Sequence, residues 1–308
     1  MKAGTESDIT GTLFTKSSPA DYDRLCSLDV LGIDETDDQR EVFQEFRSQL
    51  TRKPDGHYET GLLWKVGHPP LPNNKAGSMG RLKNLVKRLE SDPDTMETYD
   101  NVIKQQLEDG IIEEVTTQQN TTNEYYIPHK PVIRKNAEST KLRVVYDASA
   151  SNNGISLNSC LEPGPPLQNL LWSVIVRNRT HPIALCADMK QAFLQIRMKK
   201  EDRDSLRFHW IKDRDPMQIE TYRFTRALFG LNQSPFLLQG TIHQHLDNAK
   251  ERYDHDLIEK IRREIYVDDV ISGGETVEKA RELKETLIKM FGDAGFTLHK
   301  WHSNSSRI

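Results

Sequence analysis

The sequence has few cysteines, no long apolar run and no large excess of charge of one sign. Its 308 residues include three cysteines, Cys26, Cys160 and Cys186, and none belongs to a CxxC pair. An odd number without metal-ligand spacing argues against a disulfide framework or a zinc site and favours a reducing compartment. The sequence offers no membrane-spanning stretch, and its N-terminal segment lacks the hydrophobic region of a secretory signal.

The overall composition is that of an ordinary globular protein. The chain is 36% hydrophobic and 29% charged, with a net charge of −4. Its length predicts one large domain or about two. The mild acidity neither indicates nor excludes a nucleic-acid partner, because local charged patches decide such contacts.

Periodicity predicts an α+β chain whose mixed or antiparallel sheet is backed by helices. Residues 61–77 are predicted to form a strand followed by a loop. Further strands are expected at 124–135, 141–149 and 183–188, with hairpins at 206–230 and 263–274, and an extended tail at 295–308. Helices are expected at 42–50, 80–93, 96–115 with an end at Gly110, 167–179, 234–249 and 275–291.

The stretch REIYVDDVISGG at 263–274 places two adjacent carboxylates, Asp268 and Asp269, between apolar residues that favour strands. Like charges in an apolar environment repel each other and lose hydration, so they require a compensating cation. Mg²⁺ prefers oxygen ligands and binds one or two carboxylates together with substrate phosphates. A third acid, Asp188, ends the predicted buried strand IALCAD. We therefore predict that the three acids share a site suited to two-metal phosphoryl transfer.

Each acid also has a simpler interpretation. Asp188 could cap the helical turn that follows it, and Asp268 and Asp269 could form a solvated turn. A shared site explains why all three acids would be buried together, which the simpler interpretations do not. It depends on one spatial expectation: position 188 must lie beside positions 268 and 269.

Several motifs together resemble those of reverse transcriptases. They are YVDD at 266–269, DMKQAF at 188–193 and ALFGLNQSPFLLQ at 227–239, within a match that covers roughly residues 125–301 in the family's order. The stretches LRVVYDASA, GISLNSCLEPGPPLQNLL, DRDSLRFHW and GFTLHKWHSN are more narrowly similar to the Pol polyprotein of BEL/Pao LTR retrotransposons. The upstream stretches DYDRLCSLDVLGI and YETGLLWK resemble the segment that precedes the polymerase there.

The resemblance implies a right-hand polymerase with an antiparallel palm sheet backed by helices, and with the thumb largely missing. Residues 1–95 would be a linker or extension that precedes the polymerase. The fingers would comprise 96–165 and 197–233, the palm 166–196 and 234–290, and the truncated start of the palm–thumb connection 291–308. The primer grip, the full thumb and an RNase H domain would be expected beyond Ile308, so we expect this polypeptide alone to bind primer-template weakly.

The implied activity is RNA-directed DNA polymerase, a nucleotidyltransferase that adds dNTPs to a primer 3′-hydroxyl on an RNA or DNA template. Two Mg²⁺ ions are implied, and Mn²⁺ accepts the same oxygen ligands. Asp188 and Asp268 would be the main metal ligands, with Asp269 beside them and the Met189 carbonyl joining them. The triphosphate would be held by the backbone amides of Met189, Lys190, Gln191 and Ala192.

The resemblance assigns further roles around the nucleotide. Phe193 would pack beneath the sugar and exclude a 2′-hydroxyl, although an aromatic residue there could also be simple core. Phe229 would touch the incoming nucleotide, and Gly230 would permit close backbone approach to its base and sugar. Both roles follow from the motif ALFGLNQSP. A simpler interpretation of this motif is a glycine turn before a helix that starts at proline.

Three basic residues complete the predicted site. Lys135 and Arg143 flank the turn NAEST in the fingers and would offer charge and a bidentate fork to the triphosphate, although either could be a solvated surface charge. Lys300, in TLHKW, matches a family lysine near the pyrophosphate leaving group and is a candidate general acid.

Two other functions were weighed against polymerisation. A catalytically inactive nucleic-acid-binding remnant is disfavoured because all three acids, Phe193 and the SP-initiated helix are present. An aspartic peptidase requires a D-[ST]-G loop, and DAS at 147–149 lacks the glycine.

The expected partners are primer-template, dNTPs and the rest of a Pol polyprotein (protease, RNase H, integrase). The expected location is a cytoplasmic retroelement particle, and no membrane is expected.

Overall fold

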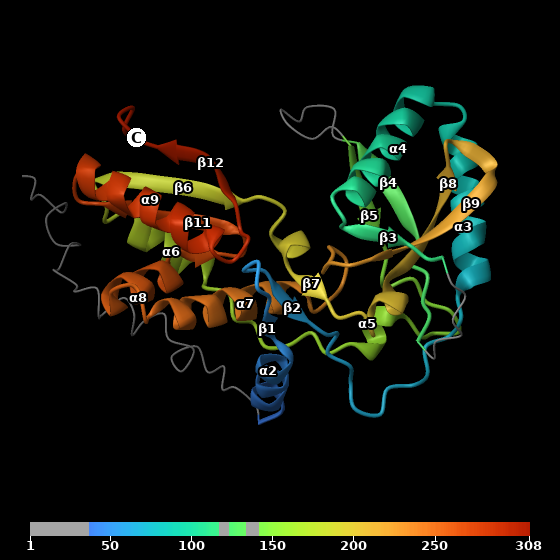
Figure 1. The fold of residues 1–308 in the computed structure, drawn as a ribbon, viewed down its shortest axis with the longest axis horizontal. Helices are drawn as coiled ribbons and strands as arrows, with labels where there is room; N and C mark the ends of the chain where they lie inside the picture. The colour runs from blue at the N-terminus through green and yellow to red at the C-terminus, as the bar shows by residue number, and fades with distance from the viewer. Residues whose placement is uncertain (1–36, 117–122, 134–141) are drawn as a thin grey trace, which may run out of the picture.

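The computed structural model describes residues 37–116, 123–133 and 142–308. A four-stranded antiparallel sheet occupies one lobe, in the order β10-β11-β6-β12. Its strands are β6 (Ile183–Met189), β10 (Ile265–Tyr266), β11 (Asp269–Gly274) and β12 (Leu298–Ser303). Figure 1 shows this lobe beside a second lobe of strands and helices.

Burial alternates along β6, so the two faces of this sheet differ. Leu185, Ala187 and Met189 are buried, whereas Cys186 and Asp188 are only partly covered. The period of two is that of a sheet with one face packed on a core. Helices α6 (Leu171–Asn178) and α9 (Val277–Gly292) contact this sheet. The more open face therefore carries Asp188.

Two further helices, α7 (Ser234–Ala249) and α8 (His255–Arg263), pack against each other in the same lobe. Pro235 lies in the first turn of α7, where the missing N–H has no intrahelical partner to lose. The helix predicted at 234–249 is thereby confirmed to the residue. Helix α8 was not expected from the sequence.

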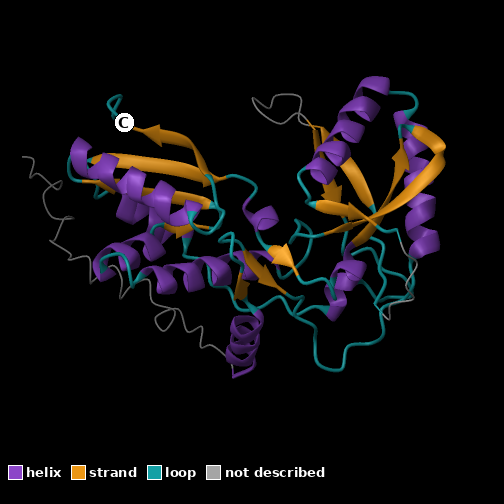
Figure 2. Cartoon of the chain, viewed as in Figure 1, coloured by secondary structure: helices purple, strands orange, loops and turns teal. Residues whose placement is uncertain are grey.

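The second lobe contains two small sheets (Figure 2). One has the order β3-β9-β8, and the other is the pair β4-β5. The strands are β3 (Ile112–Glu114), β4 (His129–Ile133), β5 (Leu142–Tyr146), β8 (Arg207–Lys212) and β9 (Asp215–Phe224). The helices are α3 (Lys75–Leu89), α4 (Pro93–Glu108) and the short α5 (Leu157–Cys160).

The upstream segment is tied into the same core. Helix α2 (Asp37–Gln49) contacts α7, and β1 (Thr51–Arg52) pairs with β2 (Tyr58–Thr60). Strand β2 runs parallel to β7 (Arg197–Met198). The Asp202 carboxylate accepts hydrogen bonds from the Leu62 amide and the Trp64 indole at 2.8 and 3.0 Å. Residues 37–64 are therefore integral to the fold around β7.

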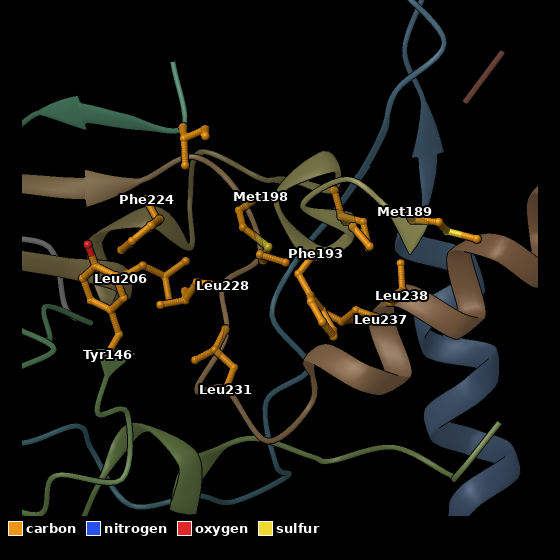
Figure 3. Packing of buried hydrophobic residues seen from close by; sticks show 14 of the residues in the cluster. Tyr146, Met189, Phe193, Met198, Leu206, Phe224, Leu228, Leu231, Leu237 and Leu238 are labelled. Atoms are coloured by element: carbon orange, nitrogen blue, oxygen red, sulfur yellow. The ribbon is translucent and has the colours of Figure 1, made fainter. Parts of the chain in front are cut away.

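One hydrophobic cluster runs through both lobes. It includes residues from the upstream segment, such as Phe46, and from both lobes, such as Phe224 and Leu287. Figure 3 shows part of it around the short 3₁₀ helix η2 (Ala192–Gln195), which follows β6. A second 3₁₀ turn, η3 (Arg203–Leu206), precedes β8. Because β6 and η2 both contribute residues to this cluster, packing fixes η2 and the end of the sheet that carries Asp188.

Most sequence-based predictions of elements are confirmed, with one local correction. The strand predicted after residue 61 is wrong: the strand lies earlier, in β2, and only an isolated bridge at Trp64 follows. The predicted end of the next helix at Gly110 is confirmed, because α4 ends at Glu108 and Gly110 adopts φ +64° before β3 begins. The antiparallel sheet backed by helices is confirmed.

Candidate active site

Asp188 and Asp269 lie directly opposite each other on neighbouring strands. They are paired in the antiparallel register of β6 and β11, so their side chains leave the same face of the sheet. His299 is paired with Asp188 from the other side, in β12. A row of Asp269, Asp188 and His299 thus crosses three adjacent strands. The expectation that positions 188 and 268–269 meet is confirmed.

Asp268 lies in the tight turn that joins β10 to β11. Tyr266 pairs with Asp269, which leaves Val267 and Asp268 as the two turn residues. Val267 has φ +54°, an unfavourable conformation for a β-branched side chain. Strain of this kind persists where surrounding contacts hold the chain. Here Gln239 of α7 donates to the Val267 carbonyl at 2.6 Å, and the Met189 amide donates to the Asp268 carbonyl at 2.8 Å.

Repulsion among the acids shifts their titration. Partial burial raises the pKa of Asp268, and the charge of Asp188 adds to this rise. Partial burial likewise raises the pKa of Asp269, with further contributions from Asp268 and Asp188. Lys300 acts in the opposite direction on both. The three acids therefore sense one another electrostatically, as carboxylates in one site do.

The acids are less buried than predicted. The side chain of Asp188 is 33% exposed, and Asp269 is exposed. Asp188 does not cap η2, because the residue at that position is Gln191 and no side chain caps it. The expectation that all three acids are buried is wrong, since they lie at the open face and end of the sheet rather than under its helices.

Lys300 and His299 both approach Asp188. The Lys300 ammonium donates to Oδ2 at 2.8 Å, and His299 Nε2 lies 3.4 Å from Oδ1. Lys300 reaches this position from a bulge in β12 and has φ +50°. Within the described ranges, no three His, Cys, Asp or Glu side chains stand close enough together to hold a metal ion. A cation at Asp188 would therefore have to displace Lys300.

The oxygen atoms of the three acids nevertheless suit a hard divalent cation. Asp188, Asp268 and Asp269 offer carboxylate oxygens, the ligands that Mg²⁺ and Mn²⁺ accept. Partial burial and repulsion between the acids raise the pKa values of Asp268 and Asp269, so negative charge on them is unfavourable without further positive charge close by. A bound cation would supply that charge.

Phe193 and Phe229 form an aromatic pair beside η2. Phe193 is 3% exposed, whereas Phe229 is 60% exposed, and their ring centroids are 4.3 Å apart in an edge-to-face arrangement. The buried ring is fixed by core packing (Figure 3), and the exposed one is available to a ligand. A core role for Phe193 and a surface role for Phe229 are both compatible with this pair.

Gly230 is required by the backbone of the second lobe. It has φ +109°, and a Cβ atom here would lie 2.4 Å from the Tyr146 carbonyl oxygen. Its own carbonyl accepts a hydrogen bond from Asn158 at 2.8 Å. The close approach that the structure shows is to Tyr146, which fixes the Phe229 loop against β5. The predicted approach to the base and sugar of a nucleotide stays a prediction.

Two of the four amides predicted to hold a triphosphate are used within the protein. The Met189 amide donates to Asp268, and the Lys190 amide donates to the Thr297 carbonyl at 2.8 Å. Gln191 has φ +50° and precedes η2, whose first amide belongs to Ala192. The first amides of a helix lack intrahelical partners, so Gln191 and Ala192 are better placed to bind an anion.

The two basic residues that were predicted to bind the triphosphate from the fingers have different outcomes. Arg143 is exposed on β5, opposite Val132 of β4. Lys135 lies outside the described residues, so its predicted role stays a prediction.

Sequence comparison now identifies the family. Residues 100–303 match the family model described as reverse transcriptase (RNA-dependent DNA polymerase). The chain belongs to the reverse transcriptase family. This reverse transcriptase domain is a nucleotidyltransferase that uses a nucleic-acid template and dNTPs, and members of its family use divalent metal ions. No curated protein matches the chain.

The sequence analysis missed two residues of this reverse transcriptase site. His299 precedes Lys300, and only its register opposite Asp188 reveals it. Gln239, which is 2% exposed, holds the Val267 turn. A glutamine within the apolar run PFLLQ was the available signal, because a buried amide needs partners.

No helix in the described part of the chain is long and apolar enough to cross a membrane. The described cysteines Cys160 and Cys186 are unpaired.

Proposed function

We propose that this reverse transcriptase domain extends a DNA primer by two-metal phosphoryl transfer, and that it derives from the Pol polyprotein of a BEL/Pao-type LTR retrotransposon. The register that opposes Asp188 and Asp269, with Asp268 in the adjoining turn, carries the catalytic part of the proposal. The BEL/Pao motifs in the sequence support the origin, and with it a cytoplasmic particle and Pol partners.

The proposed subdomains follow the two lobes. The palm comprises 166–196 and 234–290, which include the four-stranded sheet up to β11 and helices α6 to α9. The fingers comprise 96–165 and 197–233, with strands β3, β4, β5, β8 and β9. Residues 291–308, including β12, begin the connection to a thumb. Residues 1–95 remain the proposed extension, of which the part around β2 packs beside β7.

In the proposed mechanism, Asp188, Asp268 and Asp269 would hold the metal ions with the Met189 carbonyl. Divalent ions bound there would supply activation of the primer hydroxyl and positive charge for the phosphates. The strained Val267 turn, held by Gln239, fixes Asp268 against the end of β6. Hydrogen bonds of this kind, made by residues that do not bind the metal themselves, set the orientation of the carboxylates before substrate binds.

Several residues would position the nucleotide and exclude the wrong one. The amides of Gln191 and Ala192 would bind triphosphate oxygens, with Arg143 and Lys135 from the fingers. Phe193 would support the sugar and exclude a 2′-hydroxyl, and the exposed Phe229 would contact the nucleotide. Lys300, released from Asp188, would lie near the leaving group and donate a proton to it.

The decisive experiment compares primer extension by the wild type and Asp268→Asn. With Mg²⁺, dNTPs and a primed template, we expect the variant to lose nucleotide addition by at least about a hundredfold. Primer-template affinity, measured by fluorescence anisotropy, should be unchanged. Loss of both would assign Asp268 a structural role and refute the proposal. Glu278→Gln, on the exposed surface of α9, is the matched control and should retain full activity.

A further inference from the structure

Three of the seven buried side-chain polar atoms without a partner in the described residues belong to two neighbouring side chains, Arg226 and His57. In the described part of the chain, Nε and Nη1 of Arg226 and Nδ1 of His57 are buried without a hydrogen-bond partner. A buried donor without a partner costs free energy, and each such case in a native protein calls for an explanation such as a bound water or ion.

These atoms lie where the upstream segment meets the reverse transcriptase core. Arg226 is joined to Arg197 of β7 by an isolated antiparallel bridge, and β7 pairs with β2, which follows His57. The His57 ring packs on Gly295, where a Cβ atom would lie 2.5 Å from the ring. Residues from three distant parts of the sequence therefore fix this cluster, which comprises Asp55, His57, Arg197 and Arg226.

The cluster has an excess of positive charge. Arg197 pairs with Asp55, while His57 Nδ1 is 3.6 Å from the same carboxylate. The nearby carboxylate of Glu59 forms an ion pair with Lys53. Two guanidinium groups thus share one carboxylate. The uncompensated charge is also felt by its members, because burial and the charges of Arg197 and Arg203 lower the pKa of Arg226.

The nearby Arg203 does not add to the excess. Its guanidinium donates to the Met198 carbonyl at 3.0 Å and to Glu113 at 3.2 Å, so its charge is already paired. The imbalance therefore rests on Arg197 and Arg226.

Solvent reaches the cluster through the Asp55–Arg197 pair. The side chain of Asp55 is 49% exposed and that of Arg197 is 27% exposed. An exposed ion pair of this kind contributes little to stability, so a stronger anion can replace Asp55. Phosphate suits guanidinium groups because its oxygens accept several charge-assisted hydrogen bonds at once.

We propose that Arg197 and Arg226 form a phosphate-binding site, with Asp55 as the resident anion that a phosphate displaces. The site shares no residue with the predicted triphosphate contacts at Gln191, Ala192 and Arg143. Asp55 and His57 precede the segment that matches the reverse transcriptase family. The ligand is a phosphate group, which belongs to a bound nucleic-acid strand or to a nucleotide. The nucleic-acid source rests on the proposed function, whereas the binding of inorganic phosphate does not.

The first test uses inorganic phosphate as the probe. Phosphate should raise the melting temperature of the wild-type protein more than sodium chloride of equal ionic strength. The additional rise should be lost in Arg226→Met and enlarged in Asp55→Asn, which lacks the competing carboxylate. Arg88→Gln, on the exposed face of α3, is the matched control and should behave as the wild type. An equal rise in the wild type and Arg226→Met, with no gain in Asp55→Asn, would overturn the proposal.

The second test identifies the source of the phosphate. A labelled single-stranded oligonucleotide and a dNTP are each titrated against the wild type, Arg226→Met and Asp55→Asn at several salt concentrations. For a strand contact, Arg226→Met should weaken oligonucleotide binding several-fold and reduce its salt slope by about 1. For a nucleotide contact, only dNTP binding should weaken. Unchanged binding of both ligands would refute the site.

Two variants keep these tests interpretable. Asp55→Asn changes only an exposed carboxylate, so it reports on the site even if Arg226→Met fails to fold. Asp268→Asn should keep the phosphate response while losing nucleotide addition, because the two sites are separate. Failure of the catalytic proposal and failure of the phosphate site are thereby distinguishable.

Discussion

The Nζ atom of Lys300 lies 2.8 Å from Oδ2 of Asp188, so an ammonium group occupies the carboxylate proposed to bind a metal ion. Asp188 is a proposed metal ligand and Lys300 is a proposed proton donor, so one contact joins the two proposed roles. A cation that binds Asp188 releases Lys300 toward the proposed position of the leaving group.

Removal of the Lys300 charge should therefore strengthen metal binding. We expect Lys300→Gln to bind Mn²⁺ about two- to fivefold more tightly without nucleotide, because an ion pair that is half exposed is worth up to about 1 kcal/mol. Electron paramagnetic resonance of free Mn²⁺ measures this directly. Polymerisation should slow at the same time, since the proton donor is lost. Lys289→Gln, on the exposed side of α9, should change neither quantity.

Phe193→Ala should raise ribonucleotide incorporation relative to deoxynucleotide incorporation, because it opens the space beneath the sugar. The same change should lower the free energy of unfolding by about 3–5 kcal/mol, since the ring is fully packed. Single-nucleotide extension assays give the ratio, and denaturant melts give the stability. Phe193→Leu keeps most of the volume and should affect both less. An unchanged ratio in Phe193→Ala would leave Phe193 as core alone.

Gly230→Ala should destabilise the protein by on the order of 1–3 kcal/mol, because φ is positive and the new Cβ atom would clash with the Tyr146 carbonyl. Gly77→Ala is the matched control. Gly77 lies within α3 with open space around its Cα atom, so alanine should stabilise the helix by about 0.5–1 kcal/mol. Opposite shifts in melting temperature are the expected result, and equal shifts would contradict the clash.

Acid should destabilise the second lobe through His129. This ring accepts from the Tyr99 hydroxyl and donates to the His209 carbonyl at 2.8 Å, and burial lowers its pKa from 6.5 to about 4. Between these values the unfolded chain binds the proton and the folded chain does not, so stability rises with pH. We expect a loss of at most about 3 kcal/mol on acidification from pH 6.5 to 4.

His129→Gln should flatten this part of the pH–stability curve, as measured by thermal melts at a series of pH values. His255→Gln is the control, because that side chain is 69% exposed and should leave the curve unchanged. A curve of equal slope in His129→Gln would show that other groups, such as His209, dominate.

The sequence by itself determined the local elements and the chemistry of the acids. Ser234-Pro235 marked the start of α7, and the short apolar run IALCAD marked β6, because both signals depend on neighbouring residues alone. The paired acids in YVDD predicted a need for positive charge, and the raised pKa values of Asp268 and Asp269 agree with that need.

Tertiary structure decided which groups face one another. The register of β6 with β11 and β12 placed Asp269 and His299 on either side of Asp188, and a bulge turned Lys300 toward it. The excess charge around Arg226 likewise arises only when the segment containing His57 packs beside β7. Strand pairing and long-range packing join residues far apart in the chain, and no local pattern records which partners they choose.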